Sequence, residues 1–486
     1  MSRQRGRVNV GVCGGGIGGL TAAIALARGG SQVTVLEAAP ELGEIGAGIQ
    51  MTPNVARLLV RYGVSEIIGD DLVQCDRINM RGPDGSIVGF SDFKSIIKNF
   101  GFPWWVVRRD QLLAGLAEGA RRHGVNVVTG ARVDNIQSSS SATGPWGPKV
   151  TVKTEKGQSF EFDFVVGADG LRSTIRTRLF PAVKPTALTM NAAYRAVIPY
   201  DEVFAKIPEA RELLGNNIDV WMAPGSYLIS YPMTAGRDFN MVLSHHTRDG
   251  HVVVDAEDAR IDELRDSFSG YEPTVRKIVA LINESKRWPL LQTGPMTSWT
   301  NSDKNIVLMG DAAHSMVNHM AQGAATSMED GAFLGKVIAE VGRGILSLTE
   351  AVNIYEKMRM VRAWTKQQAS FTNGEIAFLS GSQLQARDTA SRVEAAGPHL
   401  NPVHPVPPPP SYRSWNIWGY ADGIPGVYAY DAEGDADSAV CDYLAQQGPV
   451  DPNTRVSQRL REKWWSWSTI EATQGEALIK GDKSRL

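Results

Sequence analysis

Residues 8–37, VNVGVCGGGIGGLTAAIALARGGSQVTVLE, decide the fold of this chain. Residues 8–14 form a short apolar run that is typical of a buried parallel strand. Residues 17–28 are rich in Ala and Leu and predict a helix, and residues 32–37 predict the next strand. Strand, glycine turn, helix and strand in this order predict a βαβ unit.

The glycines between the first strand and the helix satisfy the pattern GxGxxG. Gly14 permits the tight turn, Gly16 lets the backbone approach a pyrophosphate, and Gly19 lets the helix pack closely on the sheet. Ile17 and Gly18 open the helix, whose N-terminal amides attract phosphate groups. We therefore expect these five residues to bind a dinucleotide.

An acidic residue closes the second strand. Glu37 follows the glycines by about 20 residues, where a carboxylate accepts hydrogen bonds from an adenosine ribose and disfavours a 2′-phosphate. We place Ala38, the next residue, at the same cofactor site. The glycine turn and Glu37 fit FAD and NAD equally well.

Two later segments each place Gly and Asp at the end of an apolar strand. They are residues 165–173, VVGADGLRS, and residues 307–314, VLMGDAAH. A carboxylate in the position of Asp311 can accept hydrogen bonds from a polyol, and ribitol is the part of FAD that NAD lacks. Asp311 therefore favours FAD, although the same carboxylate is also suited to cap the helix that follows.

With these motifs the chain resembles the single-component flavoprotein aromatic hydroxylases, the group that includes p-hydroxybenzoate and salicylate hydroxylases. The resemblance covers residues from about Val8 to about Gln368. It implies that Asp169 lies near both FAD and the nicotinamide and that Asp311 binds the ribitol. In the segment VVRRDQL, residues 106–112, it implies that Arg109 contacts the flavin nucleotide, with its neighbour Arg108 as the alternative.

The resemblance also identifies residues 321–325, AQGAA, as the turn at the flavin ring. Helix N-terminal amides in such a turn stabilise negative charge on the reduced isoalloxazine. We assign cofactor contacts here to Gln322, Gly323 and Ala324. We also assign one to Gly48, which the sequence places in a loop that leads into a helix with Pro53 in its first turn.

The chain departs from many relatives just before this turn. Ser315 and Asn318 stand where those relatives carry prolines, and His319 follows. The wall beside the flavin is therefore expected to be more polar than usual.

The predicted fold class is α/β: a Rossmann-like FAD-binding βαβ domain with an inserted mixed β-sheet substrate domain, as in p-hydroxybenzoate hydroxylase, and a C-terminal helical or extended segment. The expected divisions are 1–185 and 296–395 for the two parts of the FAD-binding domain, 186–295 for the substrate domain and 396–486 for a Pro- and aromatic-rich strap. Residues 138–145 read as a polar loop at a hairpin tip. Residues 327–341 predict a long helix, and a second helix is expected to run through Gln368.

Residues 191–244 contain short runs of aromatic and β-branched residues that predict the strands of the second sheet. Candidates for binding or deprotonating a phenol lie there. Arg195 is the first choice, because a cation lowers the pKa of a phenol or holds a carboxylate. Strand alternation puts Tyr227 and Tyr231 on one face, and His246 lies nearby. The alternative role for the tyrosines is sheet packing.

The resemblance implies that NADH or NADPH reduces FAD, that O2 adds at flavin C4a and that its distal oxygen passes to an electron-rich carbon of a small phenolic or aromatic substrate. One alternative is a flavin monooxygenase that performs epoxidation or oxidative rearrangement of a larger natural product. Two others are a nicotinamide-dependent dehydrogenase and a flavin-binding partner protein without catalysis.

Composition limits the partners. The 50 Lys and Arg residues nearly balance the 52 Asp and Glu residues, so the chain has no excess positive charge that would attract a nucleic acid. The three cysteines lack metal-ligand spacing, and no apolar run reaches the roughly 18 residues of a membrane helix. We expect no metal and no membrane span, and a monomer or homodimer in the cytoplasm. The peroxisome is the alternative location, because the chain ends in Ser484-Arg485-Leu486.

Overall fold

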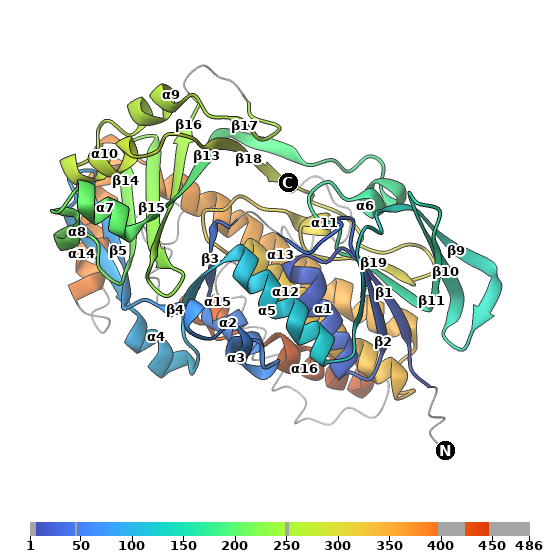
Figure 1. Cartoon of the computed structure of the whole chain (residues 1–486). Coiled ribbons are helices and arrows are strands. Elements are labelled where there is room, and N and C mark those ends of the chain that lie inside the picture. Colours follow the sequence, from blue (N-terminus) through green and yellow to red (C-terminus); the bar gives the residue numbers. More distant parts are fainter. Residues whose placement is uncertain (1–5, 44–45, 248–251, 397–422, 447–486) are drawn as a thin grey trace.

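The computed structural model describes residues 6–43, 46–247, 252–396 and 423–446. Two lobes lie side by side in Figure 1, and each is built on its own main sheet. The first lobe contains a five-stranded parallel sheet in the order β19-β12-β1-β2-β8. Its strands are β1 (Asn9–Cys13), β2 (Gln32–Leu36), β8 (Asn126–Val128), β12 (Phe164–Gly167) and β19 (Ile306–Leu308).

Helix α1 (Ile17–Arg28) joins β1 to β2, so the predicted βαβ unit is confirmed. Small residues bring α1 against α12 (Gly323–Gly342). A Cβ atom added at Gly335 would lie 2.6 Å from the Cβ of Ala25, and one at Gly331 would lie 2.7 Å from the Cα of Ala22. The two backbones therefore approach more closely than larger side chains would allow.

A three-stranded antiparallel sheet extends this lobe. It consists of β9 (Val133–Gly144), β10 (Gly147–Thr154) and β11 (Ser159–Phe162). The expected hairpin between two strands is present, but its tip is shorter than the predicted 138–145, because the chain remains in β9 as far as Gly144 and only then turns. Ser138 pairs with Val150 in this ribbon. Backbone pairing holds the strand, so its side chains do not need the apolar alternation that marks a half-buried strand.

The second lobe contains an eight-stranded mixed sheet in the order β17-β18-β13-β16-β15-β14-β5-β6. The predicted strands at 192–198, 227–232 and 239–244 fall inside β13, β15 and β16. The sheet also recruits two strands from much earlier in the chain, and β5 pairs in parallel with β14. The strands are β5 (Arg77–Arg81), β6 (Ile87–Asp92), β13 (Thr186–Pro199), β14 (Ile218–Ala223), β15 (Ser226–Met233), β16 (Asp238–His246), β17 (Glu257–Asp258) and β18 (Lys286–Gln292).

A small sheet, with β7 between β3 and β4, lies between the lobes. Its strands are β3 (Gly48–Met51), β4 (Val73–Gln74) and β7 (Trp105–Arg108). The expected loop at Gly48 is wrong, because Gly48 begins β3 and pairs with Arg108. A Cβ atom at this position would lie 2.5 Å from the ring of Tyr231. Gly48 thus serves a close approach between the lobes rather than a turn.

Short helices connect or cover these sheets. They are α2 (Pro53–Arg61), α3 (Val64–Ile68), η1 (Gly69–Asp71), α4 (Phe93–Phe100), α5 (Arg109–Arg122), α6 (Thr174–Leu179), α7 (Tyr200–Lys206), α8 (Ala210–Leu213), α9 (Ile261–Ser267), α10 (Pro273–Ala280) and α11 (Asp311–His314). Residues of α7, α9 and α10 bury one face of the eight-stranded sheet in a core of its own. The other face of the eight-stranded sheet points toward the first lobe (Figure 1).

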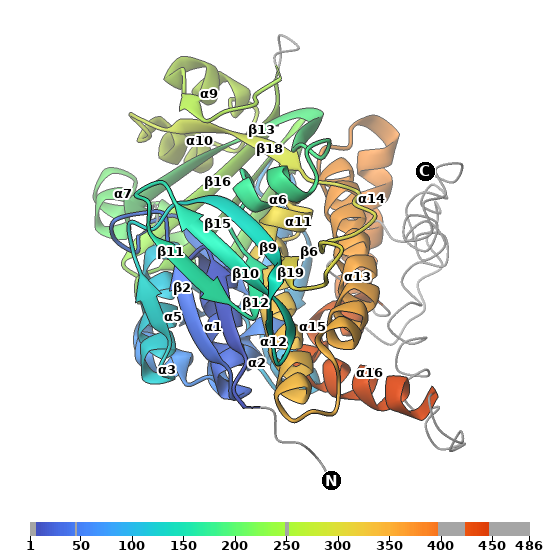
Figure 2. The same cartoon turned by 90° about the vertical axis from the view of Figure 1, so that its right-hand side faces the viewer.

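Three further helices continue the chain along one side of the molecule (Figure 2). Helix α13 (Leu348–Ala377) begins at a capping box formed by Ser347 and Glu350 and runs past Gln368. Helix α14 (Gly381–Ala396) packs against β6, and α16 (Ala432–Gln446) packs against α12 and α13. The predicted α/β class with an inserted mixed sheet is confirmed.

The C-terminal part that the structure describes packs its aromatic side chains into the molecule. Tyr428, in α15 (Gly423–Tyr428), is buried and lies 5.0 Å from the ring of Trp104. Tyr430 is also buried, and the Arg362 guanidinium stacks 3.5 Å from its ring centre. The proline run 407–410, the tryptophans 415 and 418, and the final residues 484–486 lie outside the described part.

Among the described residues, none of the helices combines the length and apolar character needed to cross a membrane. In the same part of the chain, we find no group of three or more His, Cys, Asp or Glu side chains that could hold a metal ion.

Candidate active site

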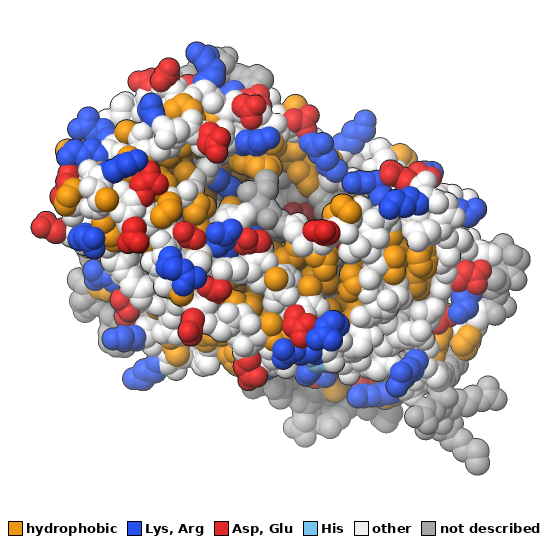
Figure 3. Space-filling view, viewed as in Figure 1, with side chains coloured by type: hydrophobic (Ala, Val, Ile, Leu, Met, Phe, Trp, Pro, Cys, Tyr) orange, Lys and Arg blue, Asp and Glu red, His pale blue; other side chains and the backbone are white. Residues whose placement is uncertain are grey.

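A cavity of about 390 Å³ lies where the two lobes meet. In the space-filling view the surface is hollowed between them, with apolar side chains around the hollow (Figure 3). One end is formed by the glycine turn and the strand ends of the first lobe, and the other by β13–β16 of the second. A single space therefore reaches from the predicted nucleotide site to the predicted substrate site.

The glycine turn forms one end of the cavity. Gly16, Ile17, Gly18 and Gly19 line it, whereas Gly14 lies behind them with a φ of 113°. A Cβ atom added at Gly16 would meet nothing within 4 Å, so the backbone at the start of α1 is open to a ligand. An open cradle at a helix N-terminus without acidic residues in the first turn is what a pyrophosphate requires. The residues present fit a dinucleotide.

Glu37 supports this turn from the end of β2. Its carboxylate accepts hydrogen bonds from the backbone amides of Gly15, at 2.6 Å, and Ala39, at 2.7 Å. Glu37 and Ala38 are not among the residues that line the cavity. In this structure Glu37 fixes the glycine turn, and its contact with a ribose stays a prediction.

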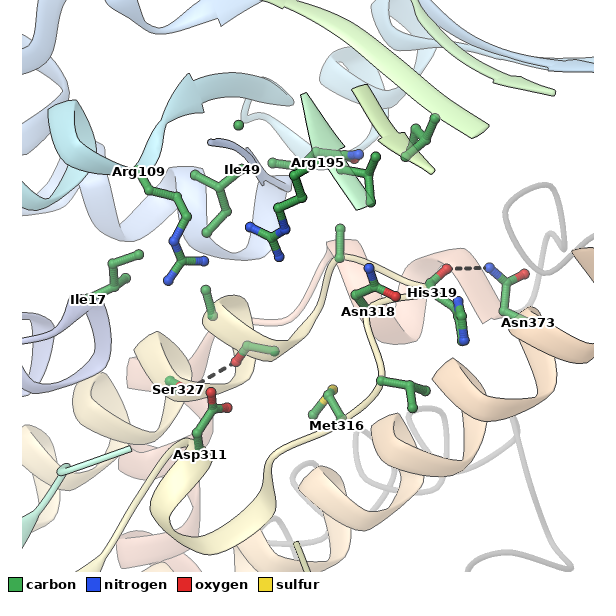
Figure 4. Close-up of a pocket in the computed structure, with 18 of the residues that line it drawn as sticks. Ile17, Ile49, Arg109, Arg195, Asp311, Met316, Asn318, His319, Ser327 and Asn373 are labelled. Carbon is green, nitrogen blue, oxygen red and sulfur yellow. Dashed lines mark hydrogen bonds between the residues drawn. The ribbon is translucent and has the colours of Figure 1, made fainter. Parts of the chain in front are cut away.

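The alternative between the two neighbouring arginines is decided by their positions. Arg109 lines the cavity and its guanidinium points into it (Figure 4). Arg108 instead pairs with Asp110 at 2.8 Å and with Asp238 at 3.5 Å. Arg109 is thus the cation that can reach a ligand in the cavity.

The two strand-end aspartates are oriented differently. Asp311 starts α11 and lines the cavity opposite Arg109 (Figure 4). The carboxylate of Asp169 accepts hydrogen bonds from the Ser173 hydroxyl, at 2.5 Å, and the Ile175 amide, at 3.1 Å. Burial raises the pKa of Asp169. Its neighbours Ala168 and Gly170 line the cavity, and its own expected contact with FAD and the nicotinamide stays a prediction.

The first turn of α12 presents backbone to the cavity. Ala321, Gly323 and Ala324 line it. The Gln322 side chain is buried and turned away: its Nε2 donates to Thr52 Oγ1 at 3.1 Å, and its Oε1 accepts from Lys366 Nζ at 2.9 Å. The expected contribution of Gln322 is therefore limited to its backbone.

Three of the four predicted substrate residues line the cavity, and one does not. Arg195 on β13 and Tyr227 and Tyr231 on β15 line the cavity. His246 does not. It is the last residue of β16, is exposed, and lies 4.5 Å from the ring of Phe378. Strand β16 extends beyond the edge of the cavity at His246. The alternation of side chains along a strand does not predict where the cavity ends.

His319, for which the sequence predicts only a place in a polar wall, lies at the cavity wall beside Asn318 (Figure 4). Its Nδ1 is 2.8 Å from the hydroxyl of Tyr227, and its backbone carbonyl accepts a hydrogen bond from Asn373 at 2.6 Å. Burial lowers the pKa of His319 to about 3, so the ring is neutral. In the sequence, only Ser315 and Asn318, which stand where many relatives carry prolines, pointed to polar contacts in this wall.

Arg387 of α14 also lines the cavity. It donates to the carbonyls of Ile376, at 3.0 Å, and Ala377, at 3.2 Å, and thereby closes the end of α13. No motif marks this residue, because α14 lies beyond the stretch that carries the resemblance.

The fold and this two-ended cavity define a flavoprotein oxygenase. The family model described as FAD binding domain matches residues 7–370, and the chain belongs to that family. FAD is its cofactor, and its relatives are hydroxylases and monooxygenases, so the chain is an FAD-dependent monooxygenase. The resemblance to single-component aromatic hydroxylases is confirmed, and the dehydrogenase alternative is set aside.

Two relatives show how far the similarity extends. A 3-hydroxybenzoate 6-hydroxylase of Polaromonas naphthalenivorans (strain CJ2) is 32% identical over 396 residues, covering 80% of this chain and 92% of the relative. The FAD-dependent monooxygenase OpS4 of Beauveria bassiana (strain ARSEF 2860) is 29% identical over 452 residues, covering 90% of this chain and 99% of the relative. Among solved structures, CtdE in complex with FAD and a substrate has a TM-score of 0.71 at 18% identity, covering 91% of this chain and 99% of CtdE.

Proposed function

We propose that this enzyme hydroxylates a small aromatic compound that carries a phenolic hydroxyl or a carboxylate, with NADH or NADPH as reductant and O2 as oxidant. The observation that carries the proposal is the position of Arg195 in the second-lobe wall of the cavity. The other residues of this wall are mainly apolar, and they include Val220, Met222, Ile229 and Val242. A mainly apolar wall that carries a placed cation suits an aromatic ring with an anionic group.

The first lobe holds FAD in this proposal. The amides at Gly16–Gly19 and the guanidinium of Arg109 bind the pyrophosphate, and Asp311 accepts hydrogen bonds from the ribitol. Glu37 stands near the ribose, and the backbone of Gly323 and Ala324 faces the flavin ring. FAD held there would take electrons from the nicotinamide and activate O2, from which the inserted oxygen atom comes.

The second lobe binds and orients the substrate. Arg195 holds the anionic group and lowers the pKa of a phenol beside it. The hydroxyl of Tyr227 is hydrogen-bonded to the neutral ring of His319 and also forms a hydrogen bond with the substrate hydroxyl. The apolar wall excludes water from the reacting carbon.

A second candidate substrate is a larger natural product. The cavity continues past the second sheet to Arg387 and Ser391 of α14, and a fungal monooxygenase matches this chain almost from end to end. A panel that contains both small phenols and polycyclic aromatics separates the two candidates, because only the preferred class stimulates NAD(P)H oxidation together with product formation.

The test uses the purified protein. It should be yellow with bound FAD, and small hydroxybenzoates should accelerate NAD(P)H oxidation with an equal amount of O2 consumed and of hydroxylated product detected by mass spectrometry. The proposal fails if FAD is bound but every small phenol or aromatic acid gives only hydrogen peroxide.

We also infer a monomer or homodimer that acts in the cytoplasm or, through Ser484-Arg485-Leu486, in the peroxisome. Light scattering gives the oligomeric state. Fluorescent fusions with and without the last three residues distinguish the compartments, because only a peroxisomal protein changes location when they are removed.

A further inference from the structure

Beneath the first turn of α12 lies a closed ring of hydrogen bonds that the proposed reaction does not use. Lys366 Nζ donates to Gln322 Oε1 at 2.9 Å and to Glu329 Oε1 at 2.8 Å. The amide of Gln322 donates to Thr52 at 3.1 Å, the Thr52 hydroxyl donates to Asn54 at 2.6 Å, and Asn54 donates to Glu329 at 2.7 Å. All five side chains are buried, so each bond is shielded from water.

The ring belongs to a larger group of buried charges, the α12–α13 charge cluster, which consists of Glu329, Asp330, Arg359, Arg362 and Lys366. Three cations face two carboxylates, so the cluster carries an excess of one positive charge when all five groups are ionised. Burial opposes ionisation of Glu329, but the charges of Arg362 and Lys366 outweigh it and hold the pKa of Glu329 well below its usual value.

Other polar groups contact the cluster, and one of them, Asp435, is a carboxylate that faces Arg359 through Tyr430. Tyr430, which precedes α16, accepts a hydrogen bond from Arg359 at 2.8 Å, and its hydroxyl donates a hydrogen bond to Asp435 at 2.8 Å. His314 of α11 contacts Asp330 at 2.6 Å. Burial lowers the pKa of Lys366 to about 7, with the charge of Arg362 acting in the same direction. The excess charge therefore depends on the protonation of Lys366 near neutral pH.

The position of Lys366 connects this charge to the cavity. Gln322, which it holds, directly precedes Gly323 and Ala324, and both of these line the cavity. The Gln322 carbonyl accepts hydrogen bonds from the Thr326 amide at 2.8 Å and the Thr326 hydroxyl at 2.6 Å, which secures the first turn of the helix. A cation behind a helix N-terminus adds to the positive end of the helix dipole.

We propose that Lys366 is a positioning residue for FAD, which holds the first turn of α12 through Gln322 and supplies the excess positive charge that favours negative charge on the flavin ring. The inference rests on the proposed placement of the flavin ring at this turn. It concerns the electronic state of bound FAD and requires no substrate, so its test is independent of which aromatic is hydroxylated.

Sulfite binding provides the readout. Sulfite adds to oxidised flavin and leaves negative charge on the ring, so its affinity reports the stabilisation of that charge without turnover. Lys366→Met should bind FAD and fold as the wild type does, yet bind sulfite at least about tenfold more weakly, because a neighbouring positive charge is lost. Lys336→Met is the matched control, since Lys336 lies on α12 but pairs at the surface with Asp437 at 2.9 Å.

The pH dependence adds a second readout. The ratio of wild-type to Lys366→Met sulfite affinity should shrink as pH rises through about 7, because the wild type then loses the ammonium charge. Taking the ratio cancels the ionisation of sulfite itself. Equal sulfite affinities in the two proteins at pH values below 7, with FAD bound in both, overturn the proposal.

A charge-compensated variant covers the case in which Lys366→Met does not fold. Lys366→Met combined with Glu329→Gln leaves Arg359 and Arg362 against Asp330 and restores the excess of one positive charge. Sulfite affinity within about threefold of the wild type supports the proposal, since a threefold difference is well under 1 kcal/mol. A loss of about tenfold or more in this double variant contradicts it.

Discussion

The hydroxyl of Tyr227 lies 2.8 Å from Nδ1 of His319, and this contact joins the two lobes across the cavity. Tyr227 belongs to β15 of the eight-stranded sheet, and His319 belongs to the loop that precedes α12. Burial raises the pKa of Tyr227 to about 12 and lowers that of His319 to about 3. At neutral pH both groups are therefore uncharged, and a hydrogen bond between two neutral groups joins the lobes.

Replacing Tyr227 by Phe should lower kcat/KM for the hydroxylation by about tenfold, because the substrate hydroxyl loses a hydrogen-bond partner. Steady-state kinetics with FAD bound to saturation measures the effect. Tyr194→Phe is the control, since Tyr194 lies on β13 of the same sheet but is buried in the core on the other face and stacks on His245 at 4.8 Å. Equal losses in the two variants would show that Tyr227 serves only packing.

Replacing Arg195 by Met should raise KM for an anionic aromatic substrate by about tenfold to a hundredfold, which corresponds to one charge-assisted hydrogen bond. FAD content should not change. Arg108→Met is the control, because Arg108 pairs with Asp110 and Asp238 rather than lining the cavity. A KM that rises no more in Arg195→Met than in the control would remove Arg195 from the substrate site.

Replacing Asp311 by Ala should weaken FAD binding by about tenfold or more, because the ribitol loses a charged acceptor. The dissociation constant follows from flavin fluorescence as FAD is titrated into apoprotein. Asp303→Ala, an exposed carboxylate in the loop before β19, should bind FAD as the wild type does. If both variants keep wild-type affinity, Asp311 does not bind the ribitol.

His319 should make the protein less stable in acid. Burial depresses its pKa from 6.5 to about 3, so between these values the unfolded chain takes up a proton that the folded protein excludes. The free energy of unfolding contributed by this group therefore falls as pH falls, by about 1.4 kcal/mol per pH unit within that window.

Urea unfolding between pH 6.5 and pH 4 of the wild type and His319→Gln measures this slope. The variant should lose stability less steeply on acidification than the wild type. Parallel curves for the wild type and His319→Gln would show that His319 is protonated in the folded protein.

The fold of the first lobe could be predicted in detail because its signals are local. Helix α1 spans residues 17–28 as predicted, since glycines bound it on both sides and its apolar residues recur with helical period. Gly48 shows the limit of such signals. A glycine permits a tight turn and a close approach equally well, and only the ring of Tyr231, far away in sequence, decides between them.

The buried C-terminal segment could not be predicted for a similar reason. Tyr430 is held by Arg359 and Arg362, about 70 residues earlier, through a hydrogen bond and a stacked guanidinium. An aromatic residue after a proline run gives no indication of such partners. The role of His319 was missed in the same way, because its partner Tyr227 lies on the other lobe.

Hydroxylation under oxygen-18 gas tests the central claim most directly. If the cavity holds FAD at one end and an aromatic substrate at Arg195, the product should contain one oxygen-18 atom from the gas and none from labelled water, with one NAD(P)H consumed for each product molecule. Unlabelled product, or NAD(P)H oxidation that yields only hydrogen peroxide with every aromatic offered, would contradict the account.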